Sequence, residues 1–403
     1  MHLSVVTGLL LLITIKTVTG QTMPSGCSYK TDGSAIGVYE CEYNSITLPL
    51  GYLTFNNPKP QRLKIYNVHG HLPASTPTAT FAGFSAFTVV DPDYAASLEI
   101  RCASGGSLLL YPGTFTGMSY LQRLSIINCK IESGFPSSLF SAIAKLDYLL
   151  VYGGSLTTLA ADAFTGLDIK KLNVPDPKGE LAFVGVTMPS TALPQGLLYS
   201  QTNLASLILD NLGLTAITSD VFSQNTLLEK ISLKYNAFTE VPTGILNGLT
   251  KLNSIDLMGT NWNCTCDNIW LVNYVNKSGI KLETGFTCVT PAIYAKKSGK
   301  EYYIKECGIP DPCITEGKGV RFGVECFTLY KMIAYGVLIL ALIIGGLALA
   351  IVCHVRRDLI TDRERLMKKR NIAWMKVQDA LLRGGGGGQR PPASTSPPAY
   401  KGW

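Results

Sequence analysis

The sequence predicts an α/β repeat protein, a solenoid of short parallel strands with disulfide-bonded ends and one transmembrane helix. Three observations support this fold class. An apolar spacing recurs about every 24 residues, cysteines gather at both ends of the repeats, and two long segments are apolar. The repeats indicate the fold, whereas the apolar segments indicate the compartment.

The repeat is clearest toward the end of the apolar pattern. The template LxxLxLxxNxL is matched by Leu228, Ile231, Leu233, Asn236 and Phe238. It recurs about 24 residues on at Leu252 and about 24 residues earlier at Leu204. Weaker matches contain Leu63, Leu98, Leu121, Leu146 and the pair Leu172 and Val174. We expect about eight units over 61–262, with irregular loops at 74–86 and 175–194.

One such unit cannot bury its own apolar side. Neighbouring units therefore stack into a curved leucine-rich-repeat solenoid, with the strands on its concave face. Both ends of the stack would expose core, so each needs a cap. We expect an N-terminal cysteine cap over 21–60, containing Cys27 and Cys41, and a C-terminal cysteine flank over 263–308.

The C-terminal flank carries the most specific motif. It follows Trp262 and contains Trp270, Cys264, Cys266, Cys288 and Cys307. Over about residues 27–307, the chain resembles the extracellular leucine-rich-repeat proteins with cysteine-rich flanks, such as Slit-like and Toll-like proteins and the lamprey variable lymphocyte receptors. The resemblance implies the pairs Cys264 with Cys288 and Cys266 with Cys307. Thr260 and Asn261 stand where that family usually has Asn-Pro, which predicts a different entry turn.

The remaining cysteines leave one question open. Ten of the 11 cysteines lie between the two apolar segments, an even number that suits an oxidising compartment. Cys313 and Cys326 are predicted to close a small loop within the juxtamembrane segment 309–330. Cys129 either replaces the repeat asparagine as a buried thiol or forms a bridge with Cys102.

The apolar segments predict a single-pass type I protein of the plasma membrane. Residues 1–20 have the pattern of a signal peptide, cleaved after Gly20. The second segment, 331–353, is long enough to cross about 30 Å of hydrocarbon. Residues 356–403 carry 11 basic and 4 acidic groups, and basic residues stay cytoplasmic. The N-terminal part is then extracellular, where Asn276 and Asn263 are candidate glycosylation sites.

The cytoplasmic part contains two candidate recruiting features. Residues 354–383 predict a basic amphipathic helix on the inner leaflet, with a calmodulin-binding helix as the alternative. Cys353 at its start is a candidate for palmitoylation. Residues 384–403 form a glycine hinge and a Pro-rich tail in which Pro397, Pro398 and Tyr400 make a PPxY motif, the kind of extended ligand that WW domains bind.

Neither an enzyme nor a nucleic-acid-binding protein is indicated. The formal charge of +7 arises near and after the second apolar segment, because residues 21–330 carry 22 basic and 24 acidic groups. His69 and His71 have no nearby Cys or carboxylate to complete a metal site, and there is no phosphate-binding loop, so no cofactor is expected. A cytoplasmic part of about 47 residues is too short for a kinase.

The leading hypothesis is a receptor or adhesion protein that binds a protein ligand on its concave face. The alternative is an auxiliary subunit of another membrane protein, because the order of signal, repeats, cysteine flank, single span and basic cluster also resembles the auxiliary gamma subunits of potassium channels. In both cases the chain is expected to act through partners and not as an enzyme.

The template also predicts which side chains face the ligand, because side chains alternate along a strand. The expected concave-face residues are Tyr66, Arg101, Ile127, Tyr148, Leu150, Tyr152, Ile208, Lys234 and Tyr235, with Lys171 and Asn173 in the fifth unit. The middle is apolar and aromatic between charged flanks, as in a binding hot spot with a polar rim. In the alternative, Leu150 or Tyr152 packs against its neighbours or under the long loop of the fifth unit.

The tail motif gives a direct test. We expect Tyr400→Ala to abolish capture of WW-domain proteins by a peptide of residues 384–403, because the tyrosine is part of the recognised motif. Pull-down with the two peptides and a panel of isolated WW domains measures this. Equal capture by both peptides would show that the motif has no such role.

Overall fold

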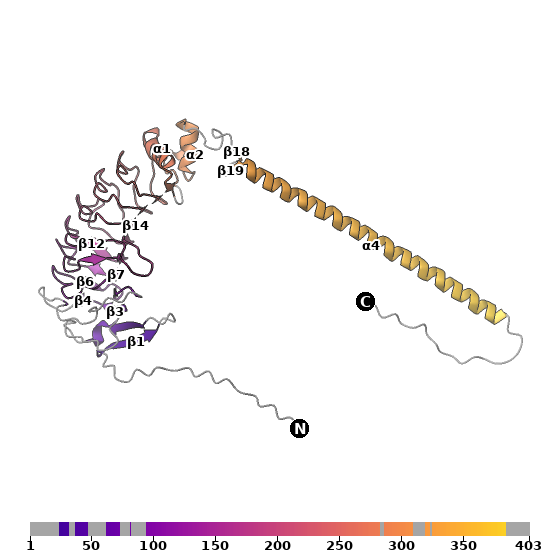
Figure 1. The fold of residues 1–403 in the computed structure, drawn as a ribbon, viewed down its shortest axis with the longest axis horizontal. Helices are drawn as coiled ribbons and strands as arrows, with labels where there is room; N and C mark the ends of the chain where they lie inside the picture. Colours follow the sequence, from indigo (N-terminus) through magenta and orange to yellow (C-terminus); the bar gives the residue numbers. More distant parts are fainter. Residues whose placement is uncertain are drawn as a thin grey trace, which may run out of the picture. The chain divides into compact units, whose positions relative to one another are not determined.

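The computed structural model describes residues 24–31, 37–46, 62–72, 81, 94–282, 286–308, 319–322 and 325–383. The predicted signal peptide, Cys313, the glycine hinge and the PPxY motif lie outside the described residues. The chain divides into two compact units, Met1–Ile309 and Pro310–Trp403. The first unit is a curved solenoid and the second is dominated by one long helix (Figure 1).

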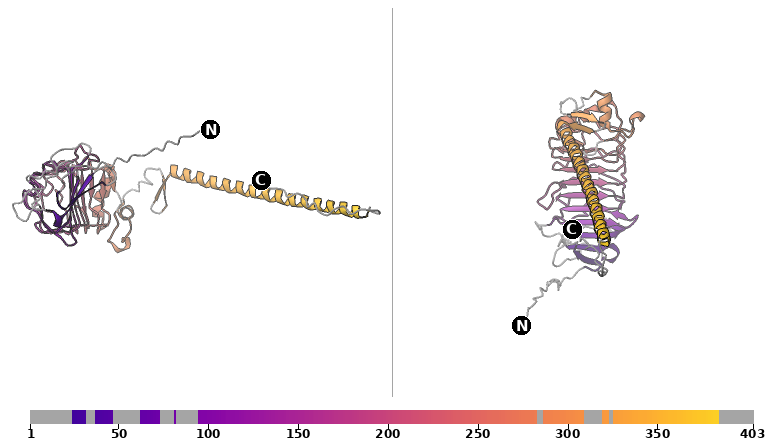
Figure 2. Two further views of the ribbon diagram at one scale, coloured as in Figure 1. Left: turned by 90° about the horizontal axis from the view of Figure 1, so that it is seen from below. Right: turned by 90° about the vertical axis from the view of Figure 1, so that its right-hand side faces the viewer.

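An 11-stranded sheet follows the concave side of the solenoid (Figures 1 and 2). In spatial order its strands are β1 (Cys27–Thr31), β2 (Gly37–Glu42), β3 (Arg62–Val68), β5 (Ser97–Cys102), β7 (Arg123–Ile127), β10 (Tyr148–Tyr152), β13 (Glu180–Val184), β14 (Ser206–Asp210), β15 (Lys230–Ser232), β16 (Ser254–Asp256) and β17 (Lys281–Leu282). Within this sheet β1 and β2 pair antiparallel, and the other neighbouring strands pair parallel. The eight strands from β3 to β16 are one per repeat, which confirms the predicted solenoid of about eight units.

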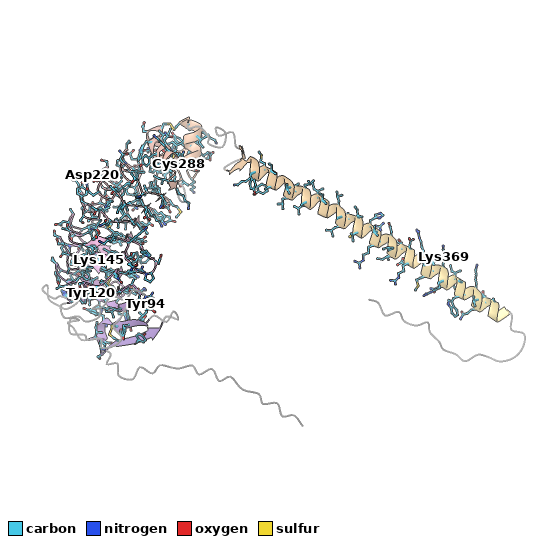
Figure 3. All side chains as sticks on the ribbon, in the orientation of Figure 1. Tyr94, Tyr120, Lys145, Asp220, Cys288 and Lys369 are labelled. Carbon is cyan, nitrogen blue, oxygen red and sulfur yellow. A yellow bond between two sulfur atoms is a disulfide. The ribbon has the colours of Figure 1, made fainter. Side chains whose placement is uncertain are left out.

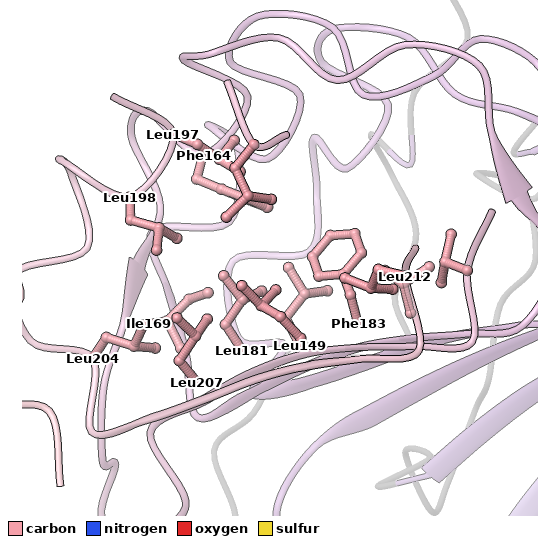
Figure 4. Close-up of a cluster of buried hydrophobic side chains, with 14 of the residues drawn as sticks. Leu149, Phe164, Ile169, Leu181, Phe183, Leu197, Leu198, Leu204, Leu207 and Leu212 are labelled. Atoms are coloured by element: carbon pink, nitrogen blue, oxygen red, sulfur yellow. The ribbon is translucent and has the colours of Figure 1, made fainter. Parts of the chain in front are cut away.

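The apolar template explains this sheet. Along β10, Leu149 and Val151 are buried while Tyr148, Leu150 and Tyr152 face outward, and β3, β5 and β7 alternate in the same way. Figure 4 shows Leu149, Leu181 and Leu207 in one row from adjacent strands, facing Phe164 and Leu197 from the outer segments. Each row removes apolar surface from water at about 25 cal/mol per Å², so stacking stabilises every unit through its neighbours.

The outer side of the solenoid contains short strands and a stack of phenylalanines. Two small parallel sheets are formed by β4 (Gly70–His71), β6 (Ser107–Leu109), β8 (Lys130–Ile131) and β11 (Ser155–Leu156), and by β9 (Lys145–Leu146) and β12 (Asp168–Ile169). Phe115, Phe140 and Phe164 stack with ring centroids 5.5 and 5.7 Å apart. These rings fill the wide outer part of three consecutive units.

The eighth template position has a left-handed backbone conformation in seven of the eight units. Asn67, Asn128, Asn211 and Tyr235 have φ of 55–59° there, and three other units have glycine. Asparagine and glycine adopt this conformation readily, whereas tyrosine rarely does. The second unit differs, because Cys102 at this position is still in β5.

Asn236, at the ninth template position, links neighbouring units. It is buried, its Nδ2 donates to the carbonyls of Leu209 (2.6 Å) and Leu233 (3.0 Å), and its Oδ1 accepts from the amides of Leu212 (3.0 Å) and Leu214 (3.2 Å). These bonds satisfy backbone groups that would otherwise be buried unpaired.

Cys129 occupies the same ninth position in the third unit and forms a disulfide with Cys102, with an S–S distance of 2.07 Å and a Cα–Cα distance of 5.0 Å. Of the two alternatives for Cys129, the structure therefore has the bridge. A disulfide thus joins the second and third units, whereas the hydrogen bonds of Asn236 join the sixth and seventh.

The fifth unit corrects the sequence prediction. The expected strand at Leu172 and Val174 is wrong, because β13 lies at Glu180–Val184, inside the segment that was expected to be irregular. Residues 170–179 form a loop whose amides at Leu172, Lys178 and Gly179 donate to Oδ1 of Asp147. Lys171 and Asn173 are thus not on a concave strand, and Glu180, Ala182 and Val184 take those positions.

Disulfides close both ends of the solenoid. Cys27–Cys41 joins β1 to β2, which is followed by a short 3-10 helix η1 (Tyr43–Ser45). The C-terminal flank contains η3 (Cys266–Asn268), α1 (Ile269–Ser278), η4 (Ala292–Tyr294) and α2 (Gly299–Glu306). Its bridges are Cys264–Cys288 and Cys266–Cys307, the pairs that the family resemblance implies; Cys288 is labelled at this end of the solenoid in Figure 3.

Trp262 fills the inside of the C-terminal flank. It is fully buried, and its Nε1 donates to the hydroxyl of Tyr303 on α2 at 3.0 Å. The Phe286 ring lies 4.9 Å from Trp262 and 6.2 Å from Tyr303. This aromatic cluster covers the apolar end of the last repeat.

The second unit has a hairpin of β18 (Gly319–Phe322) and β19 (Glu325–Thr328) followed by α4 (Leu329–Arg383). By length and composition, α4 could cross a membrane within Tyr330–Ala380. The structure has one continuous helix of 55 residues, without a break at residue 354 where a separate amphipathic segment was expected to begin. This agrees with the sequence, which has no proline in this stretch.

The phenylalanine stack gives a stability prediction. Phe140 is fully buried between Phe115 and Phe164, so Phe140→Ala should destabilise the solenoid by about 3 to 5 kcal/mol. Urea unfolding of the disulfide-bonded solenoid measures the change. The exposed Tyr120 is the control, because Tyr120→Ala should change stability by less than about 0.5 kcal/mol. Equal stability of both variants would contradict a tightly packed stack.

Candidate ligand-binding face

Three rows of outward side chains cross the concave sheet, because neighbouring parallel strands are in register. The first row contains Arg62, Ser97, Arg123, Tyr148, Glu180, Ser206, Lys230 and Ser254. The second contains Lys64, Glu99, Ser125, Leu150, Ala182, Ile208, Ser232 and Asp256. The third contains Arg101, Ile127, Tyr152, Val184 and Asp210.

The middle of the second and third rows forms an apolar patch, which we define as Ile127, Leu150, Tyr152, Val184 and Ile208. These side chains are half-buried or exposed, and Tyr152 is 48% exposed. Four of the five were predicted from the template. Val184 was missed because the strand of the fifth unit had been placed too early.

Charged residues on both sides of the patch are paired with each other. Toward the N-terminus, Arg101 contacts Glu99 at 2.9 Å and Lys64 contacts Glu40 at 3.3 Å. Toward the C-terminus, Lys234 lies 3.5 Å from Asp210 and 3.9 Å from Asp256. Such pairs contribute little to stability. They form a polar border in which each charged side chain named here has a partner of opposite charge within the protein. The apolar patch is then the part of the face that gains most by being covered.

Tyr148 is not part of the open patch. The ammonium group of Lys178, in the loop of the fifth unit, lies 4.5 Å from the centre of its ring. Burial, with a smaller contribution from the Glu180 carboxylate, raises the pKa of Tyr148 to about 12, so the phenol is neutral at physiological pH. The loop therefore covers Tyr148, whereas Tyr152 at the other end of the same strand stays exposed.

A buried ion pair holds this loop in place. The carboxylate of Asp147 is fully buried and lies 3.0 Å from the Arg123 guanidinium. Arg123 also donates to the carbonyls of Pro175 (2.9 Å) and Asp176 (2.8 Å). Residues 170–179, which we call the strap loop, are thereby fixed next to Arg123 and Tyr148. The template did not predict the ion pair that holds this loop, because Asp147 lies at a position where the template specifies no residue type.

The other predicted face residues lie apart from the patch. Tyr66 is half-buried on β3, and Tyr235 follows β15 with 53% of its surface exposed. The Tyr235 ring covers Gly259, where an added Cβ would be 2.4 Å from the ring. Of the nine predicted residues, the structure brings Ile127, Leu150, Tyr152 and Ile208 together and places Arg101 beside them.

A separate groove of about 410 Å³ lies beyond the ends of β13 and β14. It begins at Gly185, directly after Val184, and is also lined by Thr187, Met188, Asn211 and Gly213. Its lining is uncharged.

The predicted modification sites differ in access. Asn276 is exposed on α1, whereas Asn263 is half-buried and its Oδ1 accepts a hydrogen bond from the Thr290 hydroxyl. Cys353 is an exposed free thiol on α4. Within the described ranges, no group of three or more His, Cys, Asp or Glu side chains could hold a metal ion.

The architecture defines a class of protein. A curved parallel stack of about eight units with disulfide-bonded ends is a leucine-rich-repeat solenoid, and α4 fits a single-pass membrane protein. The family model described as leucine rich repeat matches residues 202–261. A relative from Lymnaea stagnalis, named as a candidate neurotrophin receptor, LTRK 1, is 34% identical over 110 residues. The match covers 27% of this chain and 13% of that relative.

The strap loop gives a second stability prediction. Asp147→Ala should destabilise the solenoid by about 3 kcal/mol, because it leaves three backbone amides without their acceptor and Arg123 without its buried counter-charge. Trypsin should then cut faster after Lys170, Lys171 and Lys178. Urea unfolding and timed proteolysis measure both effects. Glu132→Ala, which removes only an exposed pair with Lys130, is the control, and an equal response of the two variants would contradict the clamp.

Proposed function

We propose that this chain is a cell-surface receptor or adhesion protein that binds a protein ligand on the apolar patch of its concave face. The observation that carries the proposal is the cluster of the exposed Tyr152 with the half-buried Ile127, Leu150, Val184 and Ile208, between charged residues of the same rows. An exposed apolar cluster with a polar rim is typical of protein-binding sites.

The rigidity of the face supports this function. The strands are fixed by their neighbours, and the strap loop is held by Asp147 and Arg123. A preorganised face loses little conformational entropy when it binds, so more of the contact energy appears as affinity. Tyr152 offers a large ring with few rotatable bonds, which is the kind of side chain that dominates binding energy.

The membrane arrangement is part of the same proposal. The apolar part of α4 would anchor the chain, and Arg356 and Arg357 beyond it favour a cytoplasmic C-terminus. The solenoid would then be extracellular, behind a cleaved signal peptide and with a glycan on Asn276. The relative from Lymnaea stagnalis is named as a receptor, which supports this class. The short C-terminal tail would act by recruiting cytoplasmic partners.

Tyr152→Ala tests the binding face. With the disulfide-bonded solenoid as bait, a screen of cell-surface and secreted proteins identifies a ligand, and titration gives its Kd. We expect Tyr152→Ala to weaken binding by about 1 to 2 kcal/mol, or roughly tenfold, with unfolding nearly unchanged. Tyr120→Ala, which removes an equally exposed tyrosine from another surface, should bind normally. Normal binding by the Tyr152 variant would place the ligand elsewhere.

A further inference from the structure

A second exposed apolar surface lies on the C-terminal flank, away from the concave face. Residues 288–297, here called the cap loop, leave the Cys264–Cys288 disulfide and return to it, since the amides of Lys296 and Cys288 donate to the carbonyls of Cys288 and Lys297. Ile293 at its tip is 74% exposed and Val289 is 47% exposed. Ile293 is as open as the side chains along the apolar part of α4, such as Leu342 at 68%.

The cap loop is fixed to the last helix of the solenoid unit. The Tyr294 hydroxyl donates to a carboxylate oxygen of Glu306, and the Tyr294 and Tyr302 rings are 5.0 Å apart. Glu306 is the last residue of α2 and adjoins Cys307, which is tied to Cys266. The apolar tip is therefore held beside the point where the chain leaves the solenoid.

The chain length from this point is short. Ten residues, 309–318, connect Gly308 to β18, and the β18–β19 hairpin leads directly into α4. Ten residues reach at most about 35 Å. If α4 spans a membrane, this short connection keeps the cap loop close enough to reach the membrane surface. The effective concentration of the loop at that surface is then high.

The charge of the cap loop fits a phospholipid surface. From residue 289 to 306 the chain has four lysines and two glutamates. Glu301 contacts Lys305 at 2.7 Å and Glu306 accepts the Tyr294 hydrogen bond, while Lys296 and Lys297 are exposed next to the apolar tip. Lysine ammonium groups beside inserted aliphatic side chains bind lipid phosphates in this way.

We propose that the cap loop rests on the lipid headgroups of the membrane that α4 spans, with Ile293 and Val289 inserted and Lys296 and Lys297 at the phosphates. This surface docking rests on the proposed membrane anchorage.

Photo-crosslinking of the full chain tests this contact. The protein is placed in phosphatidylcholine nanodiscs that contain a photoactivatable phosphatidylcholine, then reduced and digested with trypsin. We expect lipid on two peptides, 332–356 from α4 and 282–296 from the cap loop. Ile293→Asp should lower labelling of peptide 282–296 about tenfold, whereas Ile293→Leu and the matched surface variant Leu227→Asp should keep it.

The two peptides separate the possible failures. Label on the α4 peptide without label on the cap peptide overturns the docking and leaves the anchorage intact. Labelling of the cap peptide that Ile293→Asp does not reduce overturns the assigned contact. Label on neither peptide overturns both the anchorage and the docking. Mapping of Cys264–Cys288 and Cys266–Cys307 in each variant confirms that the flank is folded.

Discussion

The structure depends on the in-register parallel pairing of neighbouring units. A single unit has one strand and a few apolar side chains, too little to overcome the entropy of ordering its backbone. Pairing of Leu149 with Leu124 on one side and with Leu181 on the other buries all three at once. Every unit is stabilised by its neighbours, and the two ends, which have a neighbour on one side only, carry three of the four disulfides of the described residues.

The same pairing creates the candidate site. Because the register is constant, equivalent positions of different units form rows, and one substitution per unit changes a row from polar to apolar. Ile127, Tyr152 and Val184 are consecutive members of one row, with Arg101 before them and Asp210 after them. The patch thus needs no special backbone, only a change of residue type at four adjacent units. Asp147 adds an irregular feature to the concave face, because it holds the strap loop over Tyr148.

The sequence predicted most of the fold and part of the site, for physical reasons. Leucine spacing records burial, so the strands of seven units and the outward positions of Leu150 and Tyr152 could be read from it. It failed in the fifth unit, because Leu172 and Val174 imitate the spacing of a strand. Their segment is fixed instead by backbone amides that donate to the side chain of Asp147, which lies 25 residues away from Leu172 in the sequence. Contacts of this kind produce no local pattern in the sequence. They determine that the strap loop covers Tyr148 and that Val184 lies on the concave strand of the fifth unit.

The edge of the concave sheet explains why the patch is open where it is. The eighth template position is left-handed in seven of the eight units, and in the third, sixth and seventh units Asn128, Asn211 and Tyr235 place a side chain there. In the fourth and fifth units this residue is Gly153 or Gly185. Gly153 is required by its neighbour, since a Cβ would be 2.3 Å from the Asn128 amide oxygen. Gly153 and Gly185 thus add no side chain of their own directly after Tyr152 and Val184, so the stacking of neighbouring units also shapes this edge of the patch.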